Sequence, residues 1–178
     1  MSLRATEEEG GRMVTRGDEF DDFVRGSSTR LLRTAVLLTG DRPAAEDLVQ
    51  EVYERVYVRW RWIKGAPEPY ARKALANLVA NRWRRKGRKP EVALAAGHDR
   101  PTPDGSDDYA VRDQLLTALQ ELPPRQRAVI VLRYYEDLTE LQTADALGCS
   151  VGTVKSQTSR GLEKLRLITE PAILEGLR

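Results

Sequence analysis

Four carboxylate side chains lie close together in the first half of the chain, and such a cluster could do chemistry. Paired carboxylates hold divalent metal ions or serve as a general acid and a general base. No histidine partner and no glycine-rich loop accompany them, and the single histidine, His98, is distant in the sequence. We therefore expect no catalytic residue and no metal ligand here. A solvated face or a protein-docking face explains these acids better: Glu46, Asp47, Glu51 and Glu54.

The second candidate chemistry is nucleic-acid binding by a segment that combines aromatic and basic side chains. Trp60 and Trp62 flank Arg61 in a short loop, where they either anchor the neighbouring helices or stack on the bases of a single strand. Residues 82–89 read RWRRKGRK, and six basic side chains at this density neutralise phosphates. A solvated basic helix end is the alternative. We favour nucleic acid because this block continues a polar helix face: Lys73, Asn77, Asn81 and Arg84.

The third candidate is a helix–turn–helix between residues 139 and 166. Thr139, with Gln142 three residues later, forms a capping-box pattern, and Gly148 stands where a helix would end with positive φ. Ser150 can then cap a second helix, which in this motif enters the major groove of DNA. An ordinary hairpin with a solvated, charged face is the alternative. The side chains that would face DNA are Lys155, Ser156, Ser159 and Arg160.

Apolar residues at helical spacing predict the elements that position these groups. We expect a break at Gly26 between the first two helices, and an apolar edge of Leu141, Ala144 and Leu147 on the first helix of the motif. Besides the two helices of the motif, the expected helices cover about 18–26, 27–39, 43–59, 67–86, 109–122 and 125–135.

A stretch rich in Pro, Gly, Ser and Asp separates two helical parts of the chain. The predicted fold is therefore all-α, with two small helical domains joined by a flexible linker. The expected organisation is a tail over 1–17, a first domain over 18–89, the linker over 90–108, a second domain over 109–170 and a tail over 171–178.

Composition narrows the class of protein further. The 178 residues include 29 Lys and Arg against 27 Asp and Glu, so the net charge of +2 does not by itself indicate nucleic acid. One Cys excludes an internal disulfide, and one Cys with one His leaves too few ligands for structural zinc. No apolar run approaches the roughly 20 residues of a membrane span, and the first residues lack the apolar core of a secretory signal. We expect a cytoplasmic protein with no cofactor and no membrane association.

Several segments resemble the extracytoplasmic-function (ECF) sigma factors, bacterial RNA polymerase subunits of the sigma-70 family. They are LLTGDRPAAEDLVQEVYERVY, the Trp-containing stretch up to RWRRKGR, and ELPPRQRAVIVLRYYEDLTELQTADALGCSVGTVKSQTSRGLEKLR. Their order and spacing extend the resemblance over about residues 18–168. It implies sigma domains 2 and 4 on either side of the linker. The composition, rich in Arg and Lys and in Ala, is typical of a high-GC actinobacterium.

The resemblance also implies a role for each face of the first domain. The helix containing AEDLVQEV would dock on the β′ subunit of core RNA polymerase through Asp47, Gln50, Glu51 and Glu54. The segment 60–85 would melt and read the −10 promoter element, and its loop over 61–67 would capture a flipped base. Asn81 stands where Asp is more usual in the family, and Tyr70 where Trp is common. The implied −10 contacts are Trp60, Trp62, Lys73, Asn77, Asn81, Arg84 and Arg85.

In the second domain, the helix–turn–helix would read the −35 element as duplex DNA. Gln157 and Ser159 replace what are often an Arg and a bulky residue. The exact −35 sequence therefore does not follow from the resemblance. The implied contacts to bases and phosphates are Thr153, Lys155, Ser156, Ser159 and Arg160.

The resemblance thus implies a promoter-specificity subunit and not an enzyme. The expected partners are the β and β′ subunits of core RNA polymerase, promoter DNA and an anti-sigma factor. A conventional helix–turn–helix regulator acting without polymerase is the alternative, but it leaves the Trp-containing loop and the acidic face unexplained. An enzyme acting on nucleic acid through carboxylate-bound metal is a second alternative.

Overall fold

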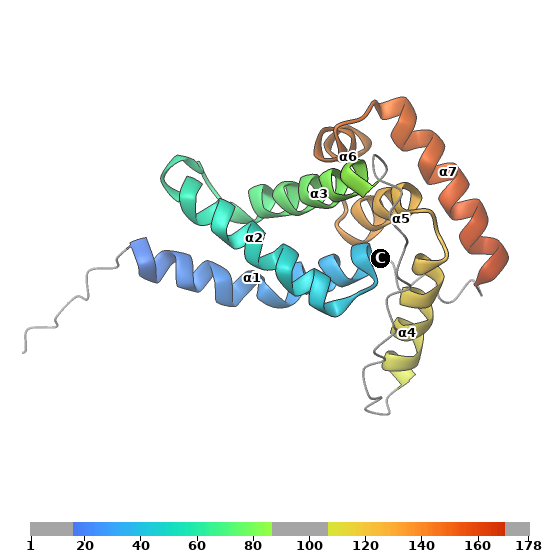
Figure 1. Ribbon diagram of the computed structural model, residues 1–178, viewed down its shortest axis with the longest axis horizontal. Helices are drawn as coiled ribbons and strands as arrows, with labels where there is room; N and C mark the ends of the chain where they lie inside the picture. The colour runs from blue at the N-terminus through green and yellow to red at the C-terminus, as the bar shows by residue number, and fades with distance from the viewer. Residues whose placement is uncertain (1–15, 87–106, 170–178) are drawn as a thin grey trace, which may run out of the picture.

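The computed structural model describes residues 16–86 and 107–169, and every regular element in these two ranges is helical (Figure 1). The predicted all-α class is confirmed. Most of the predicted N-terminal tail, the linker up to residue 106 with His98, and the C-terminal tail lie outside the described residues. In chain order the elements are α1 (Arg16–Thr39), α2 (Arg42–Arg59), the 3₁₀ turn η1 (Trp60–Trp62), α3 (Pro67–Lys86), α4 (Asp107–Gln120), α5 (Pro124–Ile130), the π-helical turn η2 (Val131–Tyr135), α6 (Glu140–Leu147) and α7 (Val151–Ile168).

α1 is one continuous helix, and the predicted break at Gly26 is wrong. A glycine inside a helix costs roughly 1 kcal/mol relative to alanine. Tertiary burial of one unbroken stripe outweighs that cost, and the Ser27 hydroxyl adds a hydrogen bond of 2.7 Å to the Phe23 carbonyl within the helix. The stripe consists of Phe23, Ser27, Leu31, Thr34 and Leu38, all buried.

α2 and α3 pack with α1 into a three-helix unit. The start of α2 is capped by the Asp41 carboxylate, which accepts a hydrogen bond of 2.9 Å from the Ala44 N–H, and Pro43 occupies the first turn. One side of α2 is buried through Leu48, Val52 and Val56. After η1 the chain turns at Gly65, with φ of +83°, and α3 begins at Pro67 as predicted. The turn places α3 back alongside α2.

α4 to α7 form the second helical unit. Asp107 and Asp108, which the composition favours as linker, already belong to α4. The single helix predicted over 125–135 is instead α5 followed by the wider turn η2, in which the Glu136 N–H bonds the Val131 carbonyl at 3.0 Å. This i→i+5 bond ends the helix just before Glu136, whose side chain is buried.

The predicted caps of the helix–turn–helix are confirmed. The Thr139 N–H donates to the Gln142 side chain at 2.8 Å, and the Gln142 N–H donates to the Thr139 hydroxyl at 3.2 Å. Gly148 ends α6 with φ of +63°, and the Ser150 hydroxyl accepts from the Thr153 N–H at 3.1 Å.

The predicted apolar edge of α6 is wrong at Leu141, which is 71% exposed. The buried positions of this two-turn helix are Thr143, Ala144 and Ala146, and Ala144 lies one turn after Leu141. Leu141 and its neighbour Gln142 are both exposed in the first turn of α6, so the apolar type of Leu141 does not decide its burial.

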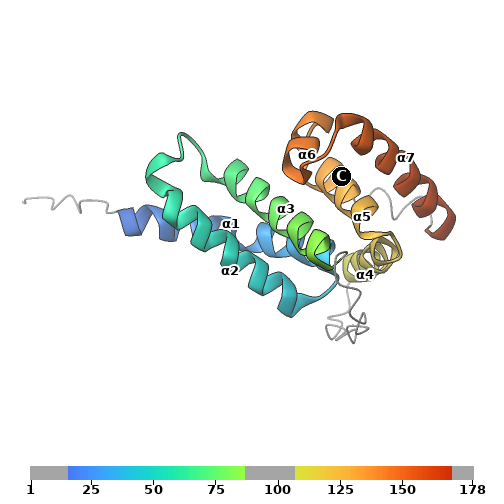
Figure 2. The ribbon, with the colours of Figure 1, turned by 45° about the horizontal axis from the view of Figure 1, so that its top comes forward.

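The two helical units pack against each other (Figures 1 and 2). Arg127 of α5 lies at the boundary, where its buried guanidinium donates to the Leu38 carbonyl at 3.4 Å and to the Leu122 carbonyl at 3.3 Å. The Leu38 carbonyl lies in the last turn of α1 and the Leu122 carbonyl between α4 and α5, where the backbone lacks intrahelical partners. Burial lowers the pKa of the Arg127 guanidinium. One apolar cluster runs through both units and includes Leu31, Ala35, Leu38, Leu75, Leu78, Leu119, Leu122 and Ile130.

Candidate nucleic-acid interface

α7 has one buried side and one polar, exposed side. Val154, Gly161 and Leu165 are buried on the inner side. Gly161 allows α5 to come close, because a Cβ at this position would lie 3.0 Å from Cγ1 of Ile130. The outer side carries every predicted −35 contact except the half-buried Thr153: Lys155, Ser156, Ser159 and Arg160 are exposed. An outward polar face on the second helix is the geometry of major-groove readers.

The start of α7 is already organised by local hydrogen bonds. The Thr153 hydroxyl lies 2.9 Å from the Ser150 hydroxyl, and the Ser156 hydroxyl donates to the Thr153 carbonyl at 3.0 Å. Lys155 extends its ammonium to within 3.7 Å of the Glu140 carboxylate on α6. This exposed pair is weak in water and leaves Lys155 available to a phosphate.

The predicted −10 face of α3 meets the second helical unit. Lys73 forms an ion pair of 2.5 Å with Asp145 of α6. Arg84 borders Gly148 at the end of α6, where a Cβ would lie 3.4 Å from the guanidinium, and it also donates to the Asn81 side chain. Asn77 is half-buried and Arg85 is exposed. The predicted −10 residues of α3 therefore share one helix, but Lys73 and Arg84 contact the second helical unit.

The two tryptophans of the loop have different environments. The Trp60 ring lies 5.3 Å from the Phe20 ring and 5.5 Å from the Phe23 ring, so it anchors η1 to α1. Trp62 is 73% exposed. A pocket of about 460 Å³ lies beside Trp60, which lines it together with Arg16 and Arg61 among others. Its volume is within the range of small-ligand pockets.

The four predicted docking residues on α2 differ in their exposure. Asp47, Gln50 and Glu54 are exposed on the side opposite the buried stripe of the helix. Glu51 is half-buried and lies 2.8 Å from Arg55 and 3.7 Å from Arg82. Three of the four predicted docking residues are therefore directly accessible.

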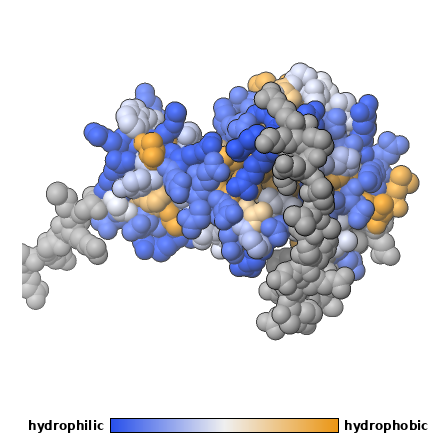
Figure 3. All heavy atoms as spheres, viewed as in Figure 1, coloured by the Kyte–Doolittle hydropathy of each residue, from blue (hydrophilic) through white to orange (hydrophobic). Residues whose placement is uncertain are grey.

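Figure 3 shows a mostly hydrophilic surface in the view of Figure 1, with hydrophobic atoms in small separate patches. Over residues 16–86 and 107–169, no three His, Cys, Asp or Glu side chains gather as a metal site would require. No helix in the same ranges is long and apolar enough to span a bilayer.

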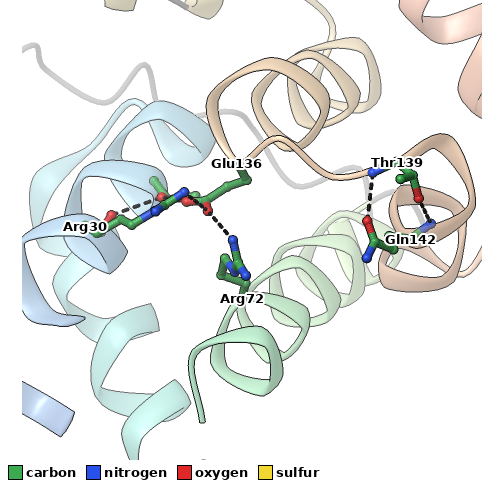
Figure 4. A network of polar contacts seen from close by, with 6 residues as sticks. Arg30, Arg72, Glu136, Thr139 and Gln142 are labelled. Carbon is green, nitrogen blue, oxygen red and sulfur yellow. Dashed lines mark hydrogen bonds and ion pairs between the residues drawn. The ribbon is translucent and has the colours of Figure 1, made fainter. Parts of the chain in front are cut away.

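Glu136 is the residue that the sequence pattern missed. Its side chain is fully buried between α1 and α3, accepts a hydrogen bond from Thr34, and lies 3.1 Å from Arg30 and 3.6 Å from Arg72 (Figure 4). Its partners lie about a hundred or about sixty positions away, so no local spacing could reveal them. The only sequence feature that sets Glu136 apart is its position directly after a predicted helix.

Comparison with known proteins agrees with this architecture. Residues 23–89 match the model of sigma-70 region 2, and residues 112–165 match that of sigma-70 region 4. The sigma-E factor of Streptomyces coelicolor is 38% identical over 150 residues, which cover 83% of this chain and 84% of the relative. The chain belongs to the ECF RNA polymerase sigma factors. The ECF sigma factor SigW of Bacillus subtilis is 30% identical over 174 residues, covering 87% of this sigma factor and 92% of SigW.

Two solved structures share the fold of this sigma factor. RpoE of Bartonella quintana, co-crystallised with the anti-sigma factor NepR, gives a TM-score of 0.67 at 24% identity and covers 84% of this chain and 96% of that chain. CnrH, in complex with the cytosolic domain of CnrY, gives 0.59 at 16% identity and covers 86% and 88%. At these identities the likeness concerns the fold alone.

The sigma factor directs promoter recognition by RNA polymerase and is not an enzyme. The family predicted from the sequence is confirmed, and the Streptomyces relatives agree with the expected actinobacterial origin. Both alternatives, a helix–turn–helix regulator independent of polymerase and an enzyme acting on nucleic acid, are excluded by this membership.

Proposed function

We propose that this sigma factor reads its promoter at two points and binds polymerase at a third. The outer face of α7 reads the −35 element as duplex, through Lys155, Ser156, Ser159 and Arg160, with Thr153 on a phosphate. Trp62 and the polar face of α3 open and read the −10 element. The exposed edge of α2, formed by Asp47, Gln50 and Glu54, docks on the β′ subunit.

One observation carries the −35 assignment. Four polar side chains on consecutive turns of α7 are exposed, while Val154, Gly161 and Leu165 hold the opposite side against the rest of region 4. A helix held in this way presents a rigid recognition face, because its inner side chains are fixed by packing. Thr153 at its N-terminus lies where backbone N–H groups and the helix dipole favour a phosphate.

The −10 assignment is supported by the exposure of Trp62 and by a pocket in the same loop that Arg16, Trp60 and Arg61 line. A base that leaves the duplex loses stacking worth a few kcal/mol, and an aromatic ring with nearby guanidinium groups replaces part of it. Lys73, Arg84 and Arg85 on α3 supply positive charge for the backbone of the separated strand.

Two further assignments follow from the family. RpoE is bound to the anti-sigma factor NepR in its structure, and we extend this kind of regulation to the present chain. A polymerase subunit acts on chromosomal DNA, so we place the protein in the cytoplasm.

Run-off transcription with purified core polymerase and a library of genomic promoter fragments tests the proposal. We expect active fragments to share two short elements at a constant separation. The Arg160→Ala variant should change the upstream element only, and the Trp62→Ala variant should reduce strand opening at the downstream element only. Activity without a shared upstream element, or identical effects of the two variants, would overturn the assignment.

A further inference from the structure

We propose that the first turn of α1 forms one wall of the base-capture pocket, and that the Glu19 carboxylate there selects a flipped base with an exocyclic amino group. The proposal rests on the assignment of the loop over 61–67 to a flipped base of the −10 element. The −10 contacts implied by the resemblance include no residue of α1. In the structure, however, the start of α1 lies beside the end of α2 and η1 (Figure 1).

Two segments that are distant in the sequence line this pocket of about 460 Å³. Arg16 and Glu19, one helical turn apart at the start of α1, form one side. The other side comes from the segment between η1 and the start of α3, and its lining includes Trp60, Arg61, Ile63 and Pro67. Apolar and aromatic side chains suit the faces of a planar base, and the charged groups can bind its polar edge.

Arg16 fixes the position of the α1 wall. Its guanidinium donates a hydrogen bond of 2.8 Å to the Tyr57 carbonyl and lies 5.1 Å from the centre of the Tyr57 ring. The Phe20 ring, next to Glu19 in the chain, lies 5.0 Å from the Tyr57 ring and 5.3 Å from the Trp60 ring. The first turn of α1 is thus held against the end of α2 and η1. We therefore regard Arg16 as a positioning residue and Glu19 as the residue that contacts the base.

The Glu19 carboxylate is available for a ligand. Within the ranges that the structure describes it forms no ion pair and no hydrogen bond, and the residue is exposed. An ionised carboxylate accepts hydrogen bonds and donates none. Cytosine, adenine and guanine each carry an amino group that can donate to it. Thymine has no amino group, and its carbonyl oxygens repel a carboxylate. Glu19 therefore favours any of the three amino-bearing bases over thymine.

The charge of the whole pocket is compatible with DNA. The lining holds two guanidinium groups, from Arg16 and Arg61, against the one carboxylate of Glu19. The positive excess attracts the phosphate backbone, whereas the carboxylate penalises a base that offers only acceptors at that point. Glu19 should therefore affect which base is bound more than how tightly DNA is bound overall.

The first test is a selection by holoenzyme assembled from the full-length sigma factor and core polymerase. Forked DNA probes with a randomised single-stranded −10 element are bound and sequenced. At one position, we expect the wild type to enrich amino-bearing bases over thymine by about fivefold or more. Glu19→Gln should lose this discrimination, because an amide can donate to a thymine carbonyl as well as accept from an amino group. Preferences at the other positions should stay unchanged.

Asp21→Asn is the matched control for Glu19→Gln. It removes the same charge from an exposed position of α1, but Asp21 is outside the pocket lining and points to nearly the opposite side of the helix. It should keep the wild-type preference. An equal loss of discrimination in both variants would assign the effect to overall charge and overturn the role of Glu19.

A second measurement removes the amino group from the DNA. The base enriched at that position is replaced by its analogue without the amino group: pyrimidin-2-one for cytosine, purine for adenine or hypoxanthine for guanine. Holoenzyme with wild-type sigma factor should bind the analogue about fivefold more weakly, and Glu19→Ala should bind both probes equally. Arg16→Ala should reduce the difference, and Arg16→Lys should restore part of it. A residue that only supports the fold would not respond to the loss of one amino group in the DNA.

The outcomes separate the role of Glu19 from that of the loop. If Glu19→Gln keeps the wild-type preference and Glu19→Ala loses as much affinity for the analogue as the wild type, Glu19 does not read the base. Weaker probe binding by Trp62→Ala would in that case retain the loop as the base-capture site. If Trp62→Ala binds all probes like the wild type and no position shows a base preference, the loop assignment fails, and the role of Glu19 fails with it.

Discussion

Glu51 of α2 and Arg82 of α3 form an ion pair, with a carboxylate oxygen 3.7 Å from the guanidinium. The other oxygen of Glu51 accepts a hydrogen bond of 2.8 Å from Arg55. Among the four residues that the sequence predicts as the polymerase-docking set, Glu51 is therefore engaged within the chain. It joins the helix proposed to dock on polymerase to the helix proposed to read DNA, whereas Asp47 and Glu54 face solvent.

The first prediction concerns those exposed acids. Asp47→Asn and Glu54→Gln should each weaken core polymerase binding by about 1 kcal/mol, or roughly fivefold, because each removes one charge from the docking edge. The effect should shrink as salt is raised. Binding of a labelled sigma factor to core polymerase provides the measurement.

Glu46→Gln is the matched control, since Glu46 is also exposed on α2 but pairs with Arg42 at 2.9 Å. It should bind polymerase as the wild type does. Equal losses in all three variants would show that overall negative charge, and not the proposed edge, determines binding.

The second prediction concerns the recognition face. Arg160→Ala should weaken binding to the −35 element by about 1–3 kcal/mol if Arg160 reads a base. A phosphate contact would instead lower affinity for all upstream sequences alike and reduce the salt dependence. Selection of active promoters from a randomised −35 region measures the difference. Arg166→Ala, at an exposed position near the other end of α7, is the control.

Local sequence signals made the caps of the helix–turn–helix predictable. Features that depend on contacts between distant residues could not be predicted in this way. The caps at Thr139, Gly148 and Ser150 depend on residues within a few positions, and all three are present. The break at Gly26 and the burial of Leu141 were predicted wrongly because tertiary packing overrides local preference. The Thr34–Glu136 hydrogen bond joins residues 102 positions apart, and no periodicity in the sequence marks such a pair.

The third prediction tests the capping box of α6. Thr139→Ala removes the oxygen that accepts from the Gln142 N–H, and helix N-caps contribute about 1 kcal/mol. Urea denaturation should show a lower midpoint with an unchanged slope. Thr139→Ser, which keeps the acceptor, should retain most of the stability. A loss as large in the serine variant would assign the effect to the methyl group instead.

The fourth prediction is a pH dependence. Burial raises the pKa of the Cys149 thiol, and the nearby Arg125 opposes this with a smaller effect. The thiolate is the reactive form, so alkylation of the folded protein should rise at higher pH than alkylation of the protein unfolded in urea. Arg125→Gln should move the midpoint further upward. A midpoint in the folded protein at or below that of the unfolded chain would contradict the burial of this thiol.

The last prediction separates the two tryptophans. Trp60→Ala should destabilise the protein by several kcal/mol, on the order of 2–4, because the ring packs on Phe20 and Phe23. Trp62→Ala should change stability by less than about 0.5 kcal/mol, since the residue is 73% exposed. It should nevertheless reduce strand opening by about 1–3 kcal/mol if the ring stacks on a base.

Thermal unfolding measures the loss of stability in Trp60→Ala, and permanganate reactivity of −10 thymines in the polymerase complex measures the loss of strand opening in Trp62→Ala. Trp62→Phe, which keeps an aromatic ring, should recover part of the opening. If Trp62→Ala opens promoters normally, base capture must depend on other residues of the loop.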